Sequence, residues 1–165
     1  MKRTMRFSCN FGRKLLLIIV NMKSSIKKIS AEATYEIRKE VLRKGIDLPF
    51  TFKEDSFDTT LHLGAFVDEK LVGIVSLIAS ANPEFDIEQY QLRGMATTVE
   101  VRGCGFGALL VAKACELLRA QGITILWCNA RKEATNFYKK LGFKVTGNEF
   151  TVQKVGPHYK MFIEL

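Results

Sequence analysis

The sequence has few of the residues that build metal centres. Its four cysteines include no C-x-x-C pair, and its two histidines, His62 and His158, lie far apart in the chain. This spacing gives no indication of a zinc site, so no metal is expected. Cysteines without a paired pattern are typical of a reducing compartment, so a cytoplasmic location is expected.

Long apolar runs are also lacking. The run at residues 15–20 is shorter than the roughly 7–15 residues of a signal-peptide core and far shorter than a membrane span of about 20. A membrane location is therefore not expected. We interpret residues 1–21 as an N-terminal extension that follows an upstream start codon, or alternatively as an added strand. Residues 22–165 are expected to form a single domain.

Charge is unbalanced in favour of the basic residues. The 165-residue chain has 25 Lys and Arg against 17 Asp and Glu, a net charge of +8. The basic residues are spread along the chain rather than concentrated in one arm or helix, so nucleic acid is not an expected partner. A phosphorylated small molecule suits the same charge.

Periodicity predicts a mixed α/β chain. Period-two and apolar runs predict strands, helical spacing predicts helices, and glycines close three of the helices. Two of the strands, separated by residues 68–70, are expected to form a hairpin. The predicted strands are residues 25–30, 61–67, 71–79, 88–98, 123–128, 143–146, 149–155 and 159–164, and the predicted helices are residues 31–44, 108–121 and 132–141.

A glycine-rich run precedes the second predicted helix. It reads Arg102-Gly103-Cys104-Gly105-Phe106-Gly107 and leads into Ala108. Glycines at alternate positions allow successive amides to turn toward one ligand, and the following helix adds unpaired N–H groups and the positive end of its dipole. The run therefore predicts a pyrophosphate-binding loop. Cys104 within it is more simply structural than nucleophilic, because no histidine stands nearby in sequence.

Two common phosphate-binding patterns fit this loop poorly. Gly103, Gly105 and Ala108 satisfy the dinucleotide pattern G-x-G-x-x-A, but the strand before the loop contains Gln91 and Arg93. The next strand ends in Asn129, where a dinucleotide site has an acidic residue for the ribose. A nucleotide-triphosphate loop is excluded because no Lys-Ser or Lys-Thr follows the glycines.

The alternative pattern, Arg102-x-x-Gly105-x-Gly107 at a helix start, resembles motif A of the GNAT superfamily of acyl-CoA-dependent N-acetyltransferases. The resemblance continues upstream through Gln91-Leu92-Arg93-Gly94-Met95-Ala96 and downstream through Leu126-Trp127-Cys128-Asn129-Ala130-Arg131. Ala134 and Phe137-Tyr138-Lys139-Lys140-Leu141-Gly142-Phe143 resemble the family's motif B. The resemblance covers roughly residues 23–165.

The resemblance implies a fold and a reaction. The fold is a three-layer α/β (α+β) arrangement in which helices flank a mixed, mostly antiparallel sheet that is splayed at the acyl-CoA site. The reaction is direct transfer of an acetyl group from acetyl-CoA to a primary amine in a ternary complex. Acetyl-CoA is the implied co-substrate, and the acceptor is a small molecule or a peptide or protein amine. A homodimer is an open alternative to a monomer.

The resemblance also implies residue roles. Tyr138 would donate a proton or hydrogen bond to the leaving thiolate, and a backbone N–H near Met95 would polarise the thioester. Asn129 and Asn136 are candidate cofactor ligands, although Asn129 is equally suited to capping the next helix. Arg131 stands where many family members have an asparagine, and it would pair with either a phosphate or a protein carboxylate. The implied cofactor-binding set is Met95, Ala96, Thr97, Arg102, Gly103, Cys104, Gly105, Phe106, Gly107, Ala108, Asn129, Asn136 and Tyr138.

The general base is less clear from the sequence. Period two places four central-strand residues on one face, and none is a carboxylate: Gln91, Arg93, Met95 and Thr97. His158, at the start of the last strand, is the candidate base, with a surface-turn histidine or a water chain as the alternatives. Arg93 would bind a substrate carboxylate or form a structural ion pair, and His62 is interpreted as structural. A non-catalytic acyl-CoA-binding or regulatory module is the second functional hypothesis.

Overall fold

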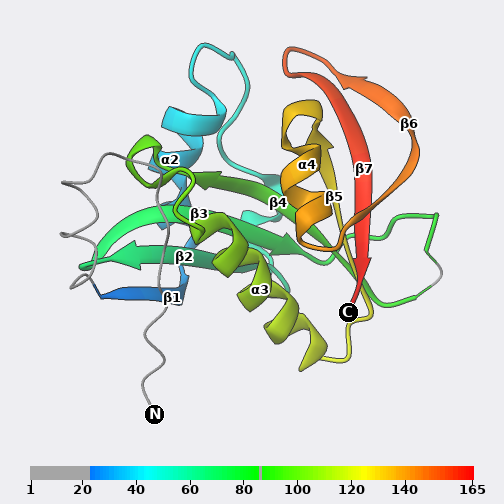
Figure 1. The fold of residues 1–165 in the computed structure, drawn as a ribbon, viewed down its shortest axis with the longest axis horizontal. Coiled ribbons are helices and arrows are strands. Elements are labelled where there is room, and N and C mark those ends of the chain that lie inside the picture. Colours follow the sequence, from blue (N-terminus) through cyan, green and yellow to red (C-terminus); the bar gives the residue numbers. More distant parts are fainter. Residues whose placement is uncertain (1–22, 86) are drawn as a thin grey trace.

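The structure is a computed structural model that describes residues 23–85 and 87–165. The interpretation of residues 1–21 therefore lies outside the described residues. Motif A follows a central strand and extends into the first turn of a long helix (Figure 1). The elements in chain order are β1 (Ser24–Ile29), α2 (Ala31–Ile37), η1 (Arg38–Leu42), η2 (Lys53–Ser56), β2 (Leu61–Val67), β3 (Lys70–Ile78), β4 (Gln89–Thr97), η3 (Val99–Val101), α3 (Phe106–Arg119), β5 (Ile125–Arg131), η4 (Lys132–Ala134), α4 (Thr135–Lys140), β6 (Lys144–Val152) and β7 (Gly156–Glu164).

One seven-stranded sheet forms the centre of the described part, in the order β1-β2-β3-β4-β5-β7-β6. Neighbouring strands are antiparallel except β4 and β5, which are parallel. Figure 1 shows strands β1 to β4 and strands β5 to β7 as two groups that diverge from each other. The predicted mixed, mostly antiparallel sheet with flanking helices is confirmed.

Helices cover both faces of the sheet. A Cβ atom on Gly73 of β3 would lie 3.2 Å from Leu110 Cδ1 of α3, whereas the neighbouring Ile74 packs with Ile37 of α2. Successive strand residues point to opposite faces. Therefore α3 packs on one face and α2 on the other, which gives three layers.

Local sequence explains where several elements begin and end. Ser30 caps α2, and its hydroxyl accepts a hydrogen bond from the Ala33 N–H at 3.4 Å. Asp68 and Glu69, at φ 45° and 68°, form the two-residue connection of the β2–β3 hairpin. The connection is one residue shorter than expected, because Lys70 already pairs with Val67.

The C-terminal hairpin differs from the prediction. Residues 143–146 and 149–155 are predicted to be two strands, but one strand, β6, runs from Lys144 to Val152 and includes most of both ranges. A register shift between Thr146 and Phe150 and a positive φ of 68° at Gly147 allow β6 to continue past its irregular centre. Among the described residues, no helix is long and apolar enough to cross a membrane.

Candidate active site

The two central parallel strands separate soon after they meet. β4 pairs with β5 only at three positions, from Gln89 with Ile125 to Gln91 with Trp127. Beyond this point β5 keeps its pairing with β7 as far as Arg131, while β4 keeps its pairing with β3 as far as Thr97. The facing edges of β4 and β5 are consequently left unpaired over their C-terminal halves, as the resemblance implied.

A β-bulge distorts β4 beside this opening. Arg93 pairs with Ser76 and Ala96 with Ile74, so Gly94 and Met95 together oppose a single residue of β3. Gly94 has φ 60°, a conformation that favours glycine, and a Cβ atom there would lie 2.9 Å from Phe52 Cε2. A bulge leaves its extra residue outside the regular ladder, so it can present main-chain groups to a ligand.

The bulge also corrects the prediction that alternate residues of β4 share one face. Gln91 and Arg93 pair with Ile78 and Ser76 and therefore face the α2 side. After the extra residue the alternation is reversed. Thr97 pairs with Gly73, which faces α3, and Met95 packs in the core on that same side.

The glycine run forms the turn that starts α3. Gly103 and Gly105 have φ of 78° and 87°, and Gly105 is the N-cap residue of α3. Arg102, Gly103 and Gly105 are exposed, whereas Cys104 is buried and packs in the core. A Cβ atom on Gly103 would meet nothing within 4 Å. The turn therefore exposes glycine backbone to a ligand while Cys104 anchors it.

Several main-chain N–H groups of the run are available to a ligand. The first hydrogen bond of α3 runs from the Leu109 N–H to the Gly105 carbonyl at 3.0 Å, so Gly107 and Ala108 precede it. The Cys104 N–H is different, because it donates to the Val101 carbonyl at 3.1 Å. The predicted cradle thus does not include the Cys104 amide.

Tyr138 lies on the α3 side of the opening. It is buried, and its hydroxyl lies 3.9 Å from Met95 Sδ at the bulge. Phe137 and Phe143 make edge-to-face contacts with its ring. Burial, followed by the neighbouring Cys128, raises the pKa of Tyr138 well above its ordinary value of 10.0. Its hydroxyl is therefore a hydrogen-bond donor throughout the neutral range.

His158 lies on the opposite face. On β7 it pairs with Arg131 of β5 and with Phe150 of β6, and its Nδ1 lies 2.8 Å from the Gly156 carbonyl. Cys128 and Ala130 of β5 pack in the α3-side core, so Arg131 and His158 face the α2 side. His158 is buried, so it is not a surface-turn histidine. Tyr138 and His158 thus approach the sheet from opposite faces.

The remaining predicted residues have simple positions. Asn129 is exposed on β5 and is not a helix cap, because η4 has Arg131 at its N-cap position. Asn136 is exposed in the first turn of α4. Arg131 has no carboxylate partner among the described residues: its Nη2 donates to the Leu42 carbonyl at 3.2 Å. Among the described residues, no cluster of His, Cys, Asp and Glu could hold a metal ion.

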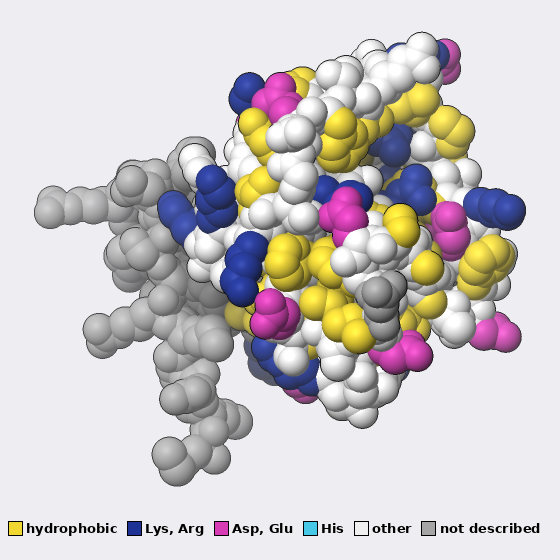
Figure 2. Space-filling view, turned by 90° about the vertical axis from the view of Figure 1, so that its right-hand side faces the viewer, with side chains coloured by type: hydrophobic (Ala, Val, Ile, Leu, Met, Phe, Trp, Pro, Cys, Tyr) yellow, Lys and Arg dark blue, Asp and Glu magenta, His cyan; other side chains and the backbone are white. Residues whose placement is uncertain are grey.

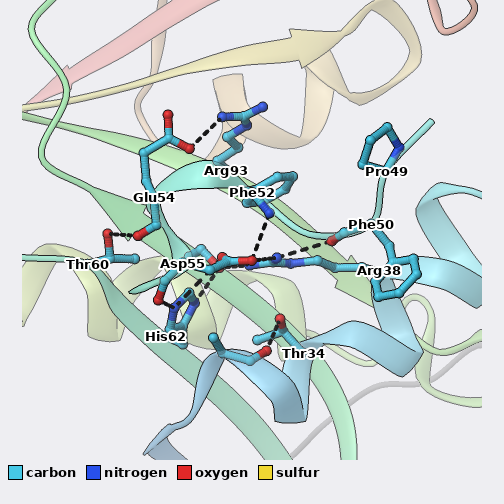
Figure 3. A network of polar contacts seen from close by, with 12 residues as sticks. Thr34, Arg38, Pro49, Phe50, Phe52, Glu54, Asp55, Thr60, His62 and Arg93 are labelled. Carbon is cyan, nitrogen blue, oxygen red and sulfur yellow. Dashed lines mark hydrogen bonds and ion pairs between the residues drawn. The ribbon is translucent and has the colours of Figure 1, made fainter. Parts of the chain in front are cut away.

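A buried ion pair fixes the loop that follows η1 (Figure 3). Arg38, 1% exposed, forms two hydrogen bonds to the Asp55 carboxylate at 2.7 and 2.9 Å. It also donates to the Phe50 carbonyl at 3.2 Å and to Ser76 Oγ at 2.8 Å. Asp55 in turn accepts from the Phe52 N–H at 2.8 Å. The pair thereby ties residues 50–55 to the first helical segment.

Phe52 lies between two guanidinium groups. The Arg38 guanidinium lies 3.9 Å from the ring centroid and that of Arg93 4.2 Å from it (Figure 3). Arg93 also forms a partly exposed ion pair with Glu54 at 3.4 Å. The stack holds the loop against the bulge of β4, next to Gly94. Phe52 is therefore a buried wall residue of this loop, and Arg93 packs on it from the strand.

The sequence did not reveal this network. Arg38 and Asp55 are 17 residues apart, and each looks like an ordinary charged residue of a solvated segment. Thr34 gives some indication of the network. It stands four residues before Arg38, on the same side of the helical segment, and both side chains are buried, so they form a polar stripe on its inner face. His62 is structural as predicted: its Nδ1 lies 2.8 Å from Ser76 Oγ.

The buried His62 predicts how stability depends on pH. Burial lowers its pKa below the ordinary 6.5, so the unfolded chain takes up a proton before the folded one does. The free energy of unfolding should therefore fall as pH drops below about 6.5, by up to about 1.4 kcal/mol per pH unit. Urea denaturation between about pH 7 and about pH 5 measures this slope, which His62→Gln should remove.

Asp55 does not confuse this test. Although burial opposes it, hydrogen bonds from Arg38 and the Phe52 N–H lower the pKa of Asp55 below its ordinary 3.8. Its contribution is present above the unfolded pKa and is lost only as pH falls through the lower folded pKa, in more acidic solution. An equal slope in the wild type and in His62→Gln would show that His62 is not the group responsible.

Comparison with known proteins agrees with this geometry. Residues 27–143 match the model of the acetyltransferase (GNAT) family. The uncharacterized N-acetyltransferase YitI of Bacillus subtilis is 37% identical over 139 residues, which cover 83% of this chain and 93% of that protein. The [ribosomal protein bS18]-alanine N-acetyltransferase of Haemophilus influenzae is 26% identical over 136 residues, 79% of this chain and 84% of that one.

Solved structures share the fold. The PaiA N-acetyltransferase of Thermoplasma acidophilum, solved in complex with coenzyme A, superposes with a TM-score of 0.66 at 22% identity, over 87% of this chain and all of that one. In this chain the sheet opens between the parallel strands β4 and β5, and a glycine turn starts α3. The chain belongs to the GNAT acetyltransferase family.

Proposed function

We propose that the protein transfers an acetyl group from acetyl-CoA directly to a primary amine. One observation carries the proposal: the glycine turn of α3, the bulge of β4 and the Tyr138 hydroxyl all border the opening between β4 and β5. These are the parts needed to hold a pyrophosphate, a thioester and a leaving thiolate. The cytoplasmic location of the protein stays a prediction from the cysteine pattern.

The chain has suitable groups for the cofactor. Exposed glycine backbone at Gly103 and Gly105, with the helix N–H groups of Gly107 and Ala108, suits the pyrophosphate, and the exposed Arg102 adds a positive charge. The unpaired edge of β4 at Met95, Ala96 and Thr97 suits a pantetheine arm that binds as an added strand. When bound, acetyl-CoA supplies the acetyl group as a thioester.

The transfer step needs a polarised carbonyl and a neutral amine. A main-chain N–H at the Met95 bulge would hydrogen-bond the thioester oxygen. The amine lone pair attacks the carbonyl carbon, the carbon–sulfur bond breaks, and sulfur leaves with the bonding electrons. His158 would accept the proton of the amine through Nε2, because Nδ1 lies at hydrogen-bond distance from the Gly156 carbonyl.

The raised pKa of Tyr138 defines its part in this step. A thiol of pKa about 8.5 is more acidic than a phenol of pKa about 10, and burial widens the difference. Complete proton transfer from Tyr138 to the thiolate is therefore uphill. We infer that Tyr138 stabilises the leaving thiolate by a hydrogen bond. This role also disfavours the non-catalytic module, since a protein that only binds acyl-CoA has no thiolate to stabilise.

A thiol-release assay with acetyl-CoA and a panel of amines tests the proposal. Release that requires an amine supports acetyl transfer. Tight coenzyme A binding without release by any amine would favour the non-catalytic module instead.

His158→Gln tests the base. Because the variant has no imidazole to accept the proton of the amine, we expect turnover to fall about 100-fold near neutral pH. The affinity for coenzyme A should stay unchanged. Steady-state kinetics and calorimetry with coenzyme A measure the two effects. An unchanged turnover number would remove His158 from the mechanism.

A further inference from the structure

Two arginines meet at a single carbonyl on the α2 side of the opening. Arg43 Nη1 and Arg131 Nη2 each donate to the Leu42 carbonyl at 3.2 Å. Arg43 Nε also donates to the Pro49 carbonyl at 2.9 Å. Because both nitrogens donate to the same carbonyl oxygen, they lie close to each other, although each guanidinium carries a full positive charge.

No carboxylate neutralises this pair. Among the described residues, neither Arg43 nor Arg131 has an Asp or Glu oxygen within 4.0 Å, whereas the buried Arg38 is paired with Asp55. Burial, and after it the neighbouring Arg131, Arg93 and Arg38, lowers the pKa of Arg43. The arginines therefore destabilise one another electrostatically, and a carbonyl dipole offsets this only in part.

A third arginine adds to the charge. Arg93 of β4 faces the same side, and its carboxylate partner, Glu54, is 3.4 Å away with both side chains partly exposed at 42% and 30%. Such an exposed pair is weak. Figure 2 shows Lys and Arg side chains gathered across the middle of the molecular face on the β6 and β7 side.

The position of the pair separates it from the cofactor's pyrophosphate. Arg131 ends β5, pairs with His158, and faces the α2 side of the sheet, whereas the glycine turn leads into α3 on the other side. Pro49 and Leu42 belong to the segment that leads to the Phe52 wall. The positive charge therefore lies where the acceptor, rather than the donor, would approach His158.

We propose that Arg43 and Arg131, with Arg93 nearby, bind a carboxylate of the acceptor, so that the acceptor is an amino acid or a short peptide with an acidic group near its amine. The proposal rests on the proposed function. A guanidinium presents parallel N–H groups that match the two oxygens of a carboxylate, and an anion here relieves the repulsion between the arginines. The same anion would hold the amine beside His158.

Matched acceptors test the proposal. Amino acids are compared with their primary amides, and X-Glu dipeptides with X-Gln dipeptides, as acceptors in the thiol-release assay. The acid form should be preferred at least about 10-fold in kcat/KM, since a charge-assisted hydrogen bond contributes about 10- to 100-fold. Because the amine of an amino-acid amide is less basic and more of it is neutral, the chemistry alone favours the amide. The two sets of pairs distinguish an α-carboxylate from a side-chain carboxylate.

Variants of Arg131 distinguish binding of the acceptor carboxylate from a purely structural role of this side chain. Arg131→Gln should lower kcat/KM about 10- to 100-fold for the acid but leave the amide nearly unchanged, and Arg131→Lys should be intermediate. If the role of Arg131 were purely structural, kcat/KM would fall equally for the acid and for the amide. Lys113→Gln, at a half-exposed position of α3, serves as the control and should leave the acid-to-amide ratio unchanged.

Binding keeps the test independent of turnover. Calorimetry in the presence of coenzyme A compares N-acetylamino acids with their amides, in the wild type and in Arg131→Gln. If no amine releases thiol, the proposed function fails, while acid-selective binding that Arg131→Gln abolishes would still support the anion site. The proposed carboxylate site would be overturned by equal kcat/KM for acid and amide, by equal binding of the two, or by equal losses for both in Arg131→Gln.

Discussion

Tyr138→Phe is expected to lower turnover about 100-fold with little change in coenzyme A affinity, because it removes a hydrogen bond that forms fully only as the thiolate leaves. The ring would stay in place, since its edge-to-face contacts with Phe137 and Phe143 do not involve the hydroxyl. The hydroxyl contact that is lost, with Met95 Sδ at 3.9 Å, is weak. Steady-state kinetics and calorimetry with coenzyme A separate the two effects.

Two results help to interpret this variant. The free energy of unfolding of Tyr138→Phe should be close to that of the wild type, so that a loss of rate is not a loss of folded protein. Because the pKa of Tyr138 is raised by burial, its removal should not create or abolish a limb of the pH profile below about pH 9. An unchanged turnover number would exclude Tyr138 from the transfer step.

Arg38→Met is expected to lower the free energy of unfolding by about 3–5 kcal/mol, because it leaves the buried Asp55 carboxylate without its counter-charge. Folded domains are stable by only about 5–15 kcal/mol, so this change would remove a substantial part of the free energy of unfolding. Urea denaturation measures it. Arg119→Met is the matched control, since Arg119 is exposed in the last turn of α3 and its replacement should cost less than about 0.5 kcal/mol.

The double variant Arg38→Met, Asp55→Asn adds a second criterion. Removing both charges should be less destabilising than the sum of the single changes, because neither charge is left buried alone. Additive effects would show that the two groups do not interact in the folded protein. Since Arg38 also stacks on Phe52, we expect the single variant to weaken acceptor binding more than coenzyme A binding.

The sequence predicts the order of elements well because the signals are local. Apolar periodicity, the glycines that close the predicted helices and the glycines of motif A each act within a few residues, and the structure has strands and helices close to the predicted positions. The opening between β4 and β5 was also expected, although only by resemblance.

What the sequence could not predict depends on pairing between distant segments. The bulge at Gly94 and Met95 is a register difference between β4 and β3, so its reversal of the faces of Met95 and Thr97 is not visible in β4 alone. The Arg38–Asp55 pair and the meeting of Arg43 with Arg131 at Leu42 likewise join residues whose proximity is set by the tertiary fold. For these last two contacts the sequence shows only charged residues, with no sign of their partners.

Direct transfer is tested most directly by following a heavy-isotope acetyl group. The protein is mixed with labelled acetyl-CoA and an amine acceptor, and mass spectrometry measures the label on the amine and on the protein while free thiol is counted. We predict one labelled amine for each thiol released, with no label on the protein. Thiol release without labelled amine, or label that accumulates on the protein before it reaches the amine, would contradict the proposed direct acetyl transfer.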